Sequence, residues 1–326
     1  MAALVERDDA VVQGLLDKLR NPATSLPAKY RILFSLRGIA GPAAHAAMLE
    51  GLKDPSALFR HEVAYCLGQR QDPAAVATLK RILKDDCEHP MVRHEAGEAL
   101  GAIGTEECLA PLREHLQDPC PEVAHTCQLA LQRIEHFAAA AAAQQAAEEA
   151  DANASESRYY SVDPTPAAPA SIPLPQLRAS LLDEQEAIFQ RYRAMFALRN
   201  RGGDEAVQAL GASFSSASSA LLKHEVAYVL GQMQDAHAVA TLKRVLEDPA
   251  ENPMVRHEAA EAMGAIAEPE CIELLKQYTK DPEPIVADSC IVALDMLEFE
   301  HSGGFQYADD GGQPAAAPPA EVTASA

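Results

Sequence analysis

The residues of this chain that could do metal chemistry are four His-Glu dipeptides. Within each half of the sequence two copies lie 33 residues apart, from 61 to 94 and from 224 to 257, and the two pairs are offset by 163 residues. The copies are His61-Glu62, His94-Glu95, His224-Glu225 and His257-Glu258. Imidazole and carboxylate together form the ligand set of a catalytic transition metal such as iron. The repetition predicts a two-metal centre shared by two related halves.

An internal comparison separates these four histidines from the other seven. When the halves are aligned at the 163-residue offset, 26 of the 35 positions in 61–95 are identical to those in 224–258. Of the eleven histidines, only the four in the dipeptides are aligned with a histidine in the other half. His89, for example, is aligned with Asn252. One such dipeptide alone would be read as an ordinary pair on a helix face. Four at two fixed spacings favour a metal site.

The composition narrows the fold class. Hydrophobic residues make up 48% of the chain, but aromatic residues only 5%, and tryptophan is absent. Alanine supplies much of the apolar content, which suits closely packed short helices better than a sheet with large core side chains. No apolar run of about 18 residues is present and the N-terminus lacks the order of a secretory signal, so we expect neither a membrane span nor export.

Charge and cysteine usage limit the partners and the compartment. The formal net charge of −21 argues against a nucleic-acid partner, because phosphate binding needs a basic face. The acidity serves either solubility or the attraction of a cationic partner such as a lysine-rich segment. Seven cysteines form no CxxC pair, which favours small buried thiols in a reducing, cytoplasmic setting.

Helix signals recur with a period of about 30 to 35 residues, which is typical of a HEAT-like solenoid. Asp-Pro steps such as Asp72-Pro73, Asp118-Pro119 and Asp281-Pro282 predict helix starts, and Gly68, Gly104 and Gly231 predict helix ends. The sequence therefore predicts an all-α fold with two pseudo-symmetric halves of about four helix pairs each. We expect the following divisions: an N-terminal repeat domain at 1–136, a flexible Ala/Ser/Pro-rich linker at 137–175, a C-terminal repeat domain at 176–301, and a disordered tail at 302–326.

The helices that carry the dipeptides should converge on the metals. Corresponding helices of successive repeats pack about 8–10 Å apart, so their side chains can share one ion. Two histidines and one carboxylate with open positions are typical of oxygen-activating non-haem iron. Glu98 and Glu261 follow His94 and His257 by four residues, and they either orient the imidazoles or serve as ordinary surface carboxylates. For the matched pairs Tyr65/Tyr228 and Met91/Met254, core packing is favoured over lining the pocket.

Two motifs carry a family resemblance. HEVAYxLGQ and PMVRHEAxEAxGAI each occur twice, on either side of the Pro-rich linker. In this respect the chain closely resembles the deoxyhypusine hydroxylase family, and the resemblance covers both predicted repeat domains. Members of that family are HEAT-repeat di-iron monooxygenases. They use O2 to hydroxylate the aminobutyl side chain of a deoxyhypusine residue on eukaryotic translation initiation factor 5A, which completes hypusine.

The resemblance implies roles for the dipeptide residues. Two Fe(2+) ions would be held by two sets of ligands, one made of His61, His94 and Glu95, the other of His224, His257 and Glu258. The remaining carboxylates, Glu62 and Glu225, would bind the cationic amines of the substrate or act as additional ligands. The acidic balance would attract the basic loop of the protein substrate. Two alternatives stay open: a dinuclear metallohydrolase that activates water, and a metal-free HEAT-repeat scaffold.

Overall fold

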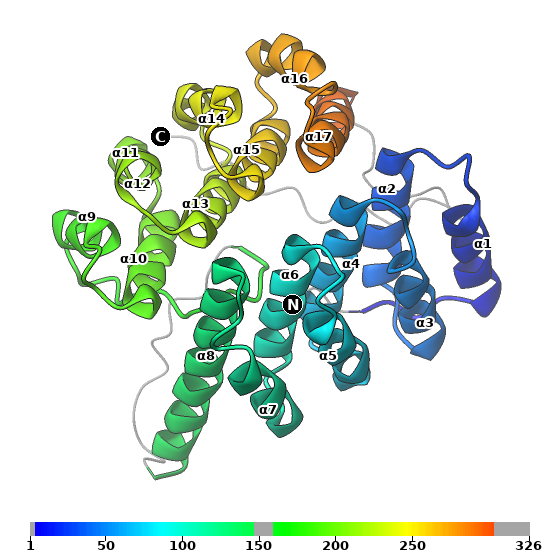
Figure 1. The fold of residues 1–326 in the computed structure, drawn as a ribbon, viewed down its shortest axis with the longest axis horizontal. Coiled ribbons are helices and arrows are strands. Elements are labelled where there is room, and N and C mark those ends of the chain that lie inside the picture. Colours follow the sequence, from blue (N-terminus) through cyan, green and yellow to red (C-terminus); the bar gives the residue numbers. More distant parts are fainter. Residues whose placement is uncertain (1–3, 147–158, 303–326) are drawn as a thin grey trace, which may run out of the picture.

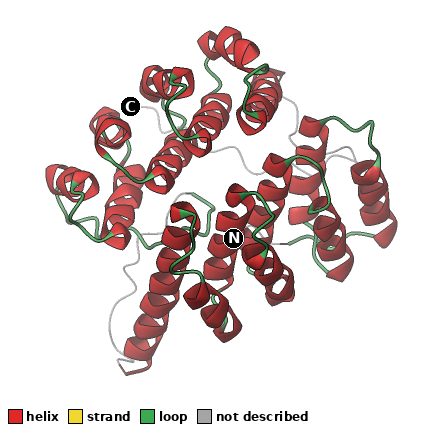
Figure 2. Cartoon of the chain, in the orientation of Figure 1, coloured by secondary structure: helices red, strands yellow, loops and turns green. Residues whose placement is uncertain are grey.

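The computed structural model describes residues 4–146 and 159–302, and the tail expected from 302 onward lies, from residue 303, outside them. The described part is built of helices, with one isolated bridge between Val5 and Ile39 (Figure 2). The first half contains α1 (Asp9–Arg20), α2 (Leu26–Arg37), α3 (Pro42–Gly51), α4 (Ala57–Gln69), η1 (Pro73–Ala75), α5 (Val76–Lys84), α6 (Pro90–Ile103), α7 (Glu106–Glu114) and α8 (Pro121–Ala146). In these residues no helix is long and apolar enough to cross a membrane.

The second half repeats this order after the connection. It contains α9 (Leu174–Leu182), α10 (Ile188–Arg201), α11 (Asp204–Gly211), α12 (Ser213–Ser216), α13 (Ala220–Met233), η2 (Ala236–Ala238), α14 (Val239–Glu247), α15 (Pro253–Ile266), η3 (Pro269–Cys271), α16 (Ile272–Tyr278) and α17 (Pro284–Ser302). The prediction of an all-α repeat fold with four helix pairs in each half is confirmed. The short helix α12 is an addition to the second half.

The two halves face each other through their inner helices. In Figure 1 the second helix of each pair lies toward the middle of the molecule, with α4 and α6 of the first half opposite α13 and α15 of the second. The ends of the arrays also meet, because α17 contacts α2 and α4, and α8 contacts α10 and α13. The inner helices therefore enclose a central space, and side chains from both halves point into it.

Helix ends follow the predicted signals only in part. Asp72 caps η1 by accepting a hydrogen bond from a backbone amide at 2.9 Å, and Gly104 ends α6 in the left-handed region with φ 69°. Gly68 and Gly231, in contrast, lie inside α4 and α13. The prediction that these two glycines end helices is wrong, because they serve helix packing instead.

Four glycines, including these two, bring the inner helices into backbone contact. They recur at the spacings of the His-Glu dipeptides, each seven residues after a histidine of that set: Gly68, Gly101, Gly231 and Gly264. A Cβ atom added at Gly68 would lie 2.7 Å from the Cα of Ala99 on α6, and one added at Gly264 would lie 2.7 Å from the Cα of Ala293 on α17. Such an approach is sterically forbidden, so these positions need glycine for the helices to stay this close.

A buried arginine beside the second histidine of each half anchors its helix. Arg93 donates to both carboxylate oxygens of Asp118 at 3.1 and 2.6 Å, and Arg256 makes the same contact with Asp281 at 3.3 and 2.6 Å. These aspartates belong to Asp-Pro steps that were predicted to start helices, but α8 and α17 begin three residues later. Their carboxylates bind the arginines instead. Loss of one partner of such a buried pair costs about 3–5 kcal/mol.

The predicted linker, residues 137–175, is structured at both of its ends. α8 continues to residue 146, residues 147–158 lie outside the described part, and residues 159–173 (the connecting segment) lie against both halves. The carboxylate of Asp163 accepts hydrogen bonds from Arg199 on α10 at 2.6 and 3.0 Å. Its carbonyl oxygen accepts one from Arg133 on α8 at 3.0 Å. The expectation of flexibility is therefore wrong for the connecting segment.

Candidate metal centre

The structure brings the four repeated histidines together at the middle of the molecule. His61, His94, His224 and His257 come from α4, α6, α13 and α15, and each has an exposed fraction of at most 7%. Their ring centroids lie between 5.2 and 6.2 Å apart, both within a half and between halves. Each imidazole sits about one turn from the start of its helix. The helix packing set by the glycines brings the four helices close enough for the rings to meet.

The ring nitrogens of these histidines are buried without hydrogen-bond partners. This holds, among the described residues, for both nitrogens of His61, His94 and His224 and for Nε2 of His257. Leaving a buried polar group unpaired costs about 1–3 kcal/mol, and a native core rarely tolerates several side by side. A cation coordinated by these nitrogens would remove that cost. The donor set therefore fits a metal site, and no fold requirement explains the same atoms.

Two carboxylates complete the cluster. The Oε2 atom of Glu95 lies 3.2 Å from Nε2 of His61, and Oε2 of Glu258 lies 3.3 Å from Nε2 of His224. In each contact the histidine of the first dipeptide meets the carboxylate of the second, across two neighbouring inner helices. The cluster contains three groups of residues, and within each group the potential ligand atoms lie within 4.8 Å of one another. The groups are His61 with His94 and His224, His224 with His257 and Glu258, and His94 with Glu95 and Glu98.

His224 belongs to two of these groups, so the groups lie next to each other. All six residues that the sequence assigned to two ions are thus brought together in one cluster rather than in two separate sites. Adjacent ions about 3.5–4 Å apart are typical of dinuclear enzymes, in which both metals act on the same reacting atoms.

Burial keeps the protein groups of the cluster electrically neutral. Burial lowers the pKa of His224 to about 4, and it lowers the pKa of His94 and His257 well below the usual value, with the neighbouring histidines as a further cause. Burial raises the pKa of Glu95 and of Glu258 to about 8. Neutral imidazoles are ready to bind a metal, whereas each carboxylate must lose a proton to do so. A bound cation supplies the charge that favours this loss.

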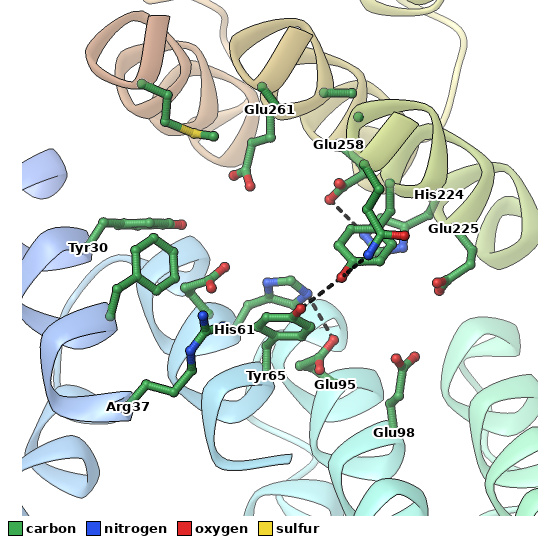
Figure 3. A pocket seen from close by; sticks show the side chains of 18 of the residues that line it. Tyr30, Arg37, His61, Tyr65, Glu95, Glu98, His224, Glu225, Glu258 and Glu261 are labelled. Atoms are coloured by element: carbon green, nitrogen blue, oxygen red, sulfur yellow. Dashed lines mark hydrogen bonds and ion pairs between the residues drawn. The ribbon is translucent and has the colours of Figure 1, made fainter. Parts of the chain in front are cut away.

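A cavity of about 360 Å³ opens beside the histidines, and six carboxyl groups line it: Glu62, Glu95, Glu98, Glu225, Glu258 and Glu261. In Figure 3 Glu225 and Glu98 lie on one side of the histidines, and Glu261 lies on the other, where Tyr30 and Arg37 form the wall. Neither Glu98 nor Glu261 is an ordinary surface carboxylate, because both face this cavity.

The four carboxyl groups outside the metal cluster share the cavity, and those of one half affect the ionisation of those of the other. Burial raises the pKa of Glu62 to about 8, and Glu261 of the other half is the next cause. Burial also raises the pKa of Glu225 well above its usual value, and Glu98 is again the next cause. Two carboxyl groups in one low-dielectric space disfavour each other's ionised form. A positively charged group placed between them would allow both to ionise, so such a pair is suited to bind a cation.

Matched tyrosines close one side of the cavity. The hydroxyl groups of Tyr65 and Tyr228 lie 2.8 Å apart across the two halves (Figure 3). The side chain of Gln232 donates to Tyr228 at 3.0 Å and to Ser161 of the connecting segment at 3.1 Å. Both tyrosines line the cavity and also pack against the core, so the prediction that favoured core packing over lining the pocket holds only in part.

Among the side chains that the structure describes, the remaining histidines stay outside the cluster, as the internal comparison predicts. His89 caps α6, with Nδ1 accepting a hydrogen bond from the amide of Met91 at 3.2 Å, and Asn252 caps α15 in the same way at 2.9 Å. These caps line a second cavity of about 240 Å³ together with Met91 and Met254. Both methionines are buried in the hydrophobic core and neither lines the cavity beside the histidines, which confirms that prediction.

The internal comparison missed part of the cavity wall. Tyr30 and Arg37 line the cavity, yet at the 163-residue offset they face Arg193 and Asn200. A signal based on duplicated residues cannot find positions where the halves differ. These residues make the cavity unlike on its two sides, although the metal cluster is nearly symmetric.

The fold and the site together define a helical-repeat protein with a buried candidate metal centre between its halves. A family model described as HEAT repeats matches residues 12–90, 86–158 and 208–295, and one described as PBS lyase HEAT-like repeat matches residues 190–216.

Similar proteins identify the family. The chain is 51% identical over 304 residues to deoxyhypusine hydroxylase of Gallus gallus, covering 93% of this chain and 96% of the relative. It is 50% identical to deoxyhypusine hydroxylase of Homo sapiens, covering 92% and 94%. The solved structure of human deoxyhypusine hydroxylase in complex with glycerol matches with a TM-score of 0.82 and 49% identity, over 89% of this chain and 96% of that one. The chain belongs to the deoxyhypusine hydroxylase family, which confirms the resemblance seen in its motifs.

Proposed function

We propose that this chain is a cytoplasmic iron-dependent monooxygenase that hydroxylates the deoxyhypusine side chain of eukaryotic translation initiation factor 5A. The observation that carries the proposal is the cluster of seven buried imidazole nitrogens that make no hydrogen bond, beside a cavity lined by carboxyl groups. The family membership supplies the reaction class, and the cavity supplies a binding site for a cationic substrate.

We assign the metal ligands as the family resemblance implies, and the clustering of these residues supports the assignment. His61, His94 and Glu95 would hold one Fe(2+), and the equivalent residues His224, His257 and Glu258 would hold the other. When bound, two iron ions would activate O2 and supply the oxidising power needed for an unactivated C–H bond. The chain's own residues hold the ligands in neutral form, keep the centre buried and position the substrate beside it.

The two carboxyl pairs fit a substrate that carries two amines. Deoxyhypusine has a secondary amine and a terminal amine with a short carbon chain between them. We group Glu62 with Glu261, and Glu98 with Glu225, as two candidate cation sites beside the histidines. We assign one ammonium group to each pair, so that the intervening carbons lie over the metal cluster. The reacting carbon is thereby oriented by charge at both of its ends.

The acidic cavity also favours association with a basic loop. The net charge of −21 gives the molecule a field that attracts a positively charged partner at long range. The attraction would weaken as salt rises, because exposed charges are screened over about 8–10 Å at physiological ionic strength.

The alternatives fit the observations less well. A metal-free scaffold would leave the buried imidazole nitrogens uncompensated, at about 1–3 kcal/mol each. A dinuclear hydrolase would use a similar ligand set. However, the relatives that match over nine-tenths of the chain are named hydroxylases.

The direct test is mass analysis of the deoxyhypusine-bearing factor after incubation with iron-loaded protein and O2. We expect a gain of one oxygen atom on the modified residue, and none under nitrogen. An unchanged mass with a fully iron-loaded protein would refute the proposal. Activity with zinc and without O2 would support the hydrolase instead.

Glu62→Gln and Glu225→Gln separate substrate binding from metal binding. Each variant removes one carboxylate that would pair with an amine, and a hydrogen bond to a charged group contributes about 1.5–3 kcal/mol. We therefore expect kcat/KM for the protein substrate to fall roughly 10- to 150-fold with both iron ions retained. Exposed Glu247→Gln serves as the matched control, with no change in either quantity. Loss of an iron ion from Glu62→Gln would instead make this carboxylate a ligand.

A further inference from the structure

A buried hydroxyl group lies behind the second histidine of the C-terminal half. Ser289 on α17 has an exposed fraction of 0%, and its Oγ lies 3.3 Å from Nδ1 of His257. The same oxygen donates a hydrogen bond to Oε1 of Glu261 at 2.9 Å. Glu261 itself is 3.9 Å from the same ring nitrogen, so the hydroxyl group provides the closer link.

These contacts favour the tautomer of His257 that carries its proton on Nδ1. Because the hydroxyl hydrogen of Ser289 is given to Glu261, its oxygen is left to accept a hydrogen bond from Nδ1–H of His257. The proton on Nδ1 leaves the lone pair on Nε2, the nitrogen that is buried without a partner among the described residues. Nε2 is therefore the atom that faces the cluster as a metal ligand, and the chain Glu261–Ser289–His257 holds the ring in that orientation.

The equivalent position in the first half is Thr126, at the same 163-residue offset. Thr126 has an exposed fraction of 2%, and its Oγ1 is buried without a partner, as is Nδ1 of His94. Glu98 occupies the place of Glu261. Both halves thus put a hydroxyl group and a carboxyl group behind the second histidine, and in the first half the hydroxyl group and the imidazole each still need a partner.

The halves differ here in a way that isolates the hydroxyl group. A Cβ added at Gly97 would lie 3.2 Å from the Cγ2 methyl of Thr126, so glycine makes room for that methyl. In the second half the methyl is absent from Ser289, and Ala260 stands where Gly97 does. In the first half Thr126 carries the methyl group, and in the second half Ala260 carries it, so the packed volume is similar in the two halves. What both halves keep is the hydroxyl.

We propose that Ser289 and Thr126 are positioning residues that orient Nε2 of His257 and of His94 toward the metal. The hydroxyl group of Ser289 links His257 to Glu261. That of Thr126, which makes no hydrogen bond here, would serve His94 beside Glu98 in the same way. The inference rests on the metal centre of the proposed function and adds residues that never touch metal or substrate. Loss of such a hydrogen bond behind a metal ligand typically weakens metal binding about 10- to 100-fold.

Two substitutions at Thr126 separate positioning from packing. Thr126→Val keeps the volume and the methyl groups but removes the hydroxyl, whereas Thr126→Ser keeps the hydroxyl and removes the methyl. The measurement is a titration of metal-free protein with Co(II) against a competing chelator, without substrate or O2. We expect the first variant to bind one of its two ions about 10- to 100-fold more weakly and the second to match the unsubstituted chain.

The second half offers the matched experiment. Ser289→Ala should weaken the binding of one ion by the same factor. The double variant Ser289→Thr with Ala260→Gly, which reproduces the arrangement of the first half, should bind both ions as tightly as the unsubstituted chain. Urea midpoints of the metal-free variants show whether each is folded.

The results distinguish this inference from the proposed function. If Thr126→Val binds two ions as tightly as the unsubstituted chain, or if Thr126→Ser is the weaker variant, the positioning role is refuted and the metal centre stands. If the unsubstituted chain binds no metal, both fail. A chain that binds two ions and shows the expected losses, yet transfers no oxygen, would refute only the proposed function.

Discussion

Gly68→Ala tests whether close helix packing builds the metal centre. Gly68 lies on α4 two turns beyond His61, and a Cβ there would lie 2.7 Å from the Cα and 2.8 Å from the Cβ of Ala99 on α6. Carbon atoms pack best at about 3.5–4.0 Å, so α4 and α6 must separate by about 1 Å. Since α6 carries His94, the same displacement spreads the imidazoles that should share one ion.

The magnitude comes from two opposing effects. Replacing a helical glycine by alanine gains about 1 kcal/mol of helix stability, whereas overpacking a tight interior contact costs about 1–3 kcal/mol. Gly14 on α1 is the matched control, because a Cβ there meets nothing within 4 Å. Gly14→Ala should therefore stabilise the metal-free protein by about 1 kcal/mol, and Gly68→Ala should be less stable than it by about 1–3 kcal/mol.

Urea unfolding of the two metal-free variants measures this difference, and a chelator competition measures metal binding. We expect Gly68→Ala to bind at least one ion more weakly, while Gly14→Ala binds both ions as the unsubstituted chain does. Equal stabilities of the two variants would show that α4 and α6 are not held at the distance seen here. If Gly68→Ala is destabilised but binds metal with unchanged affinity, the contact between α4 and α6 does not determine the geometry of the metal site.

Two further predictions follow from caps and from protonation. Metal analysis should show that His94→Ala loses at least one ion per chain, whereas His89→Asn keeps both. The stability of His89→Asn should stay within about 0.5 kcal/mol of the unsubstituted chain, because Asn252 makes the same cap in the second half. Loss of metal from His89→Asn would show that the internal comparison chose the wrong histidines. Metal-free protein should lose stability as pH rises from about 6.5 to 8.5. The folded state holds protons on Glu95 and Glu258, whose pKa is raised to about 8, and the unfolded state does not. The lowered pKa values leave the cluster's histidines neutral in this window, so they do not offset the effect. Thermal midpoints with and without metal check this. The slope should be smaller in the loaded protein, where Glu62, whose pKa is also raised to about 8, still contributes, and an equal slope would contradict the prediction.

The sequence was sufficient for the fold class and for the four histidines, because the duplication acts as an alignment inside one chain. Positions that drifted, such as His89 and His45, could be set aside, and the structure places His45 beside Asp72, away from the cluster. The pairing of each first-dipeptide histidine with a second-dipeptide carboxylate also follows once neighbouring helices are assumed to pack side by side.

Other features could not be predicted because their causes are long-range. A glycine that ends a helix and a glycine that admits a neighbouring backbone look alike in sequence, so Gly68 and Gly231 were misassigned while Gly104 was assigned correctly. The connecting segment has no periodic apolar pattern. Its order depends on arginines 30 and 36 residues away from Asp163 in the chain.

The connecting segment explains how ligands from separate halves can be held within one cluster. Arg133 belongs to the first half and Arg199 to the second, and both donate to Asp163. Val162 also exchanges two hydrogen bonds with Gln69, at 2.8 and 3.3 Å, at the end of α4. A flexible tether would leave the halves free to separate, whereas ligand atoms from both lie within 4.8 Å of one another. The connection therefore acts as a third element of the site, because it fixes the distance across which the two halves must meet.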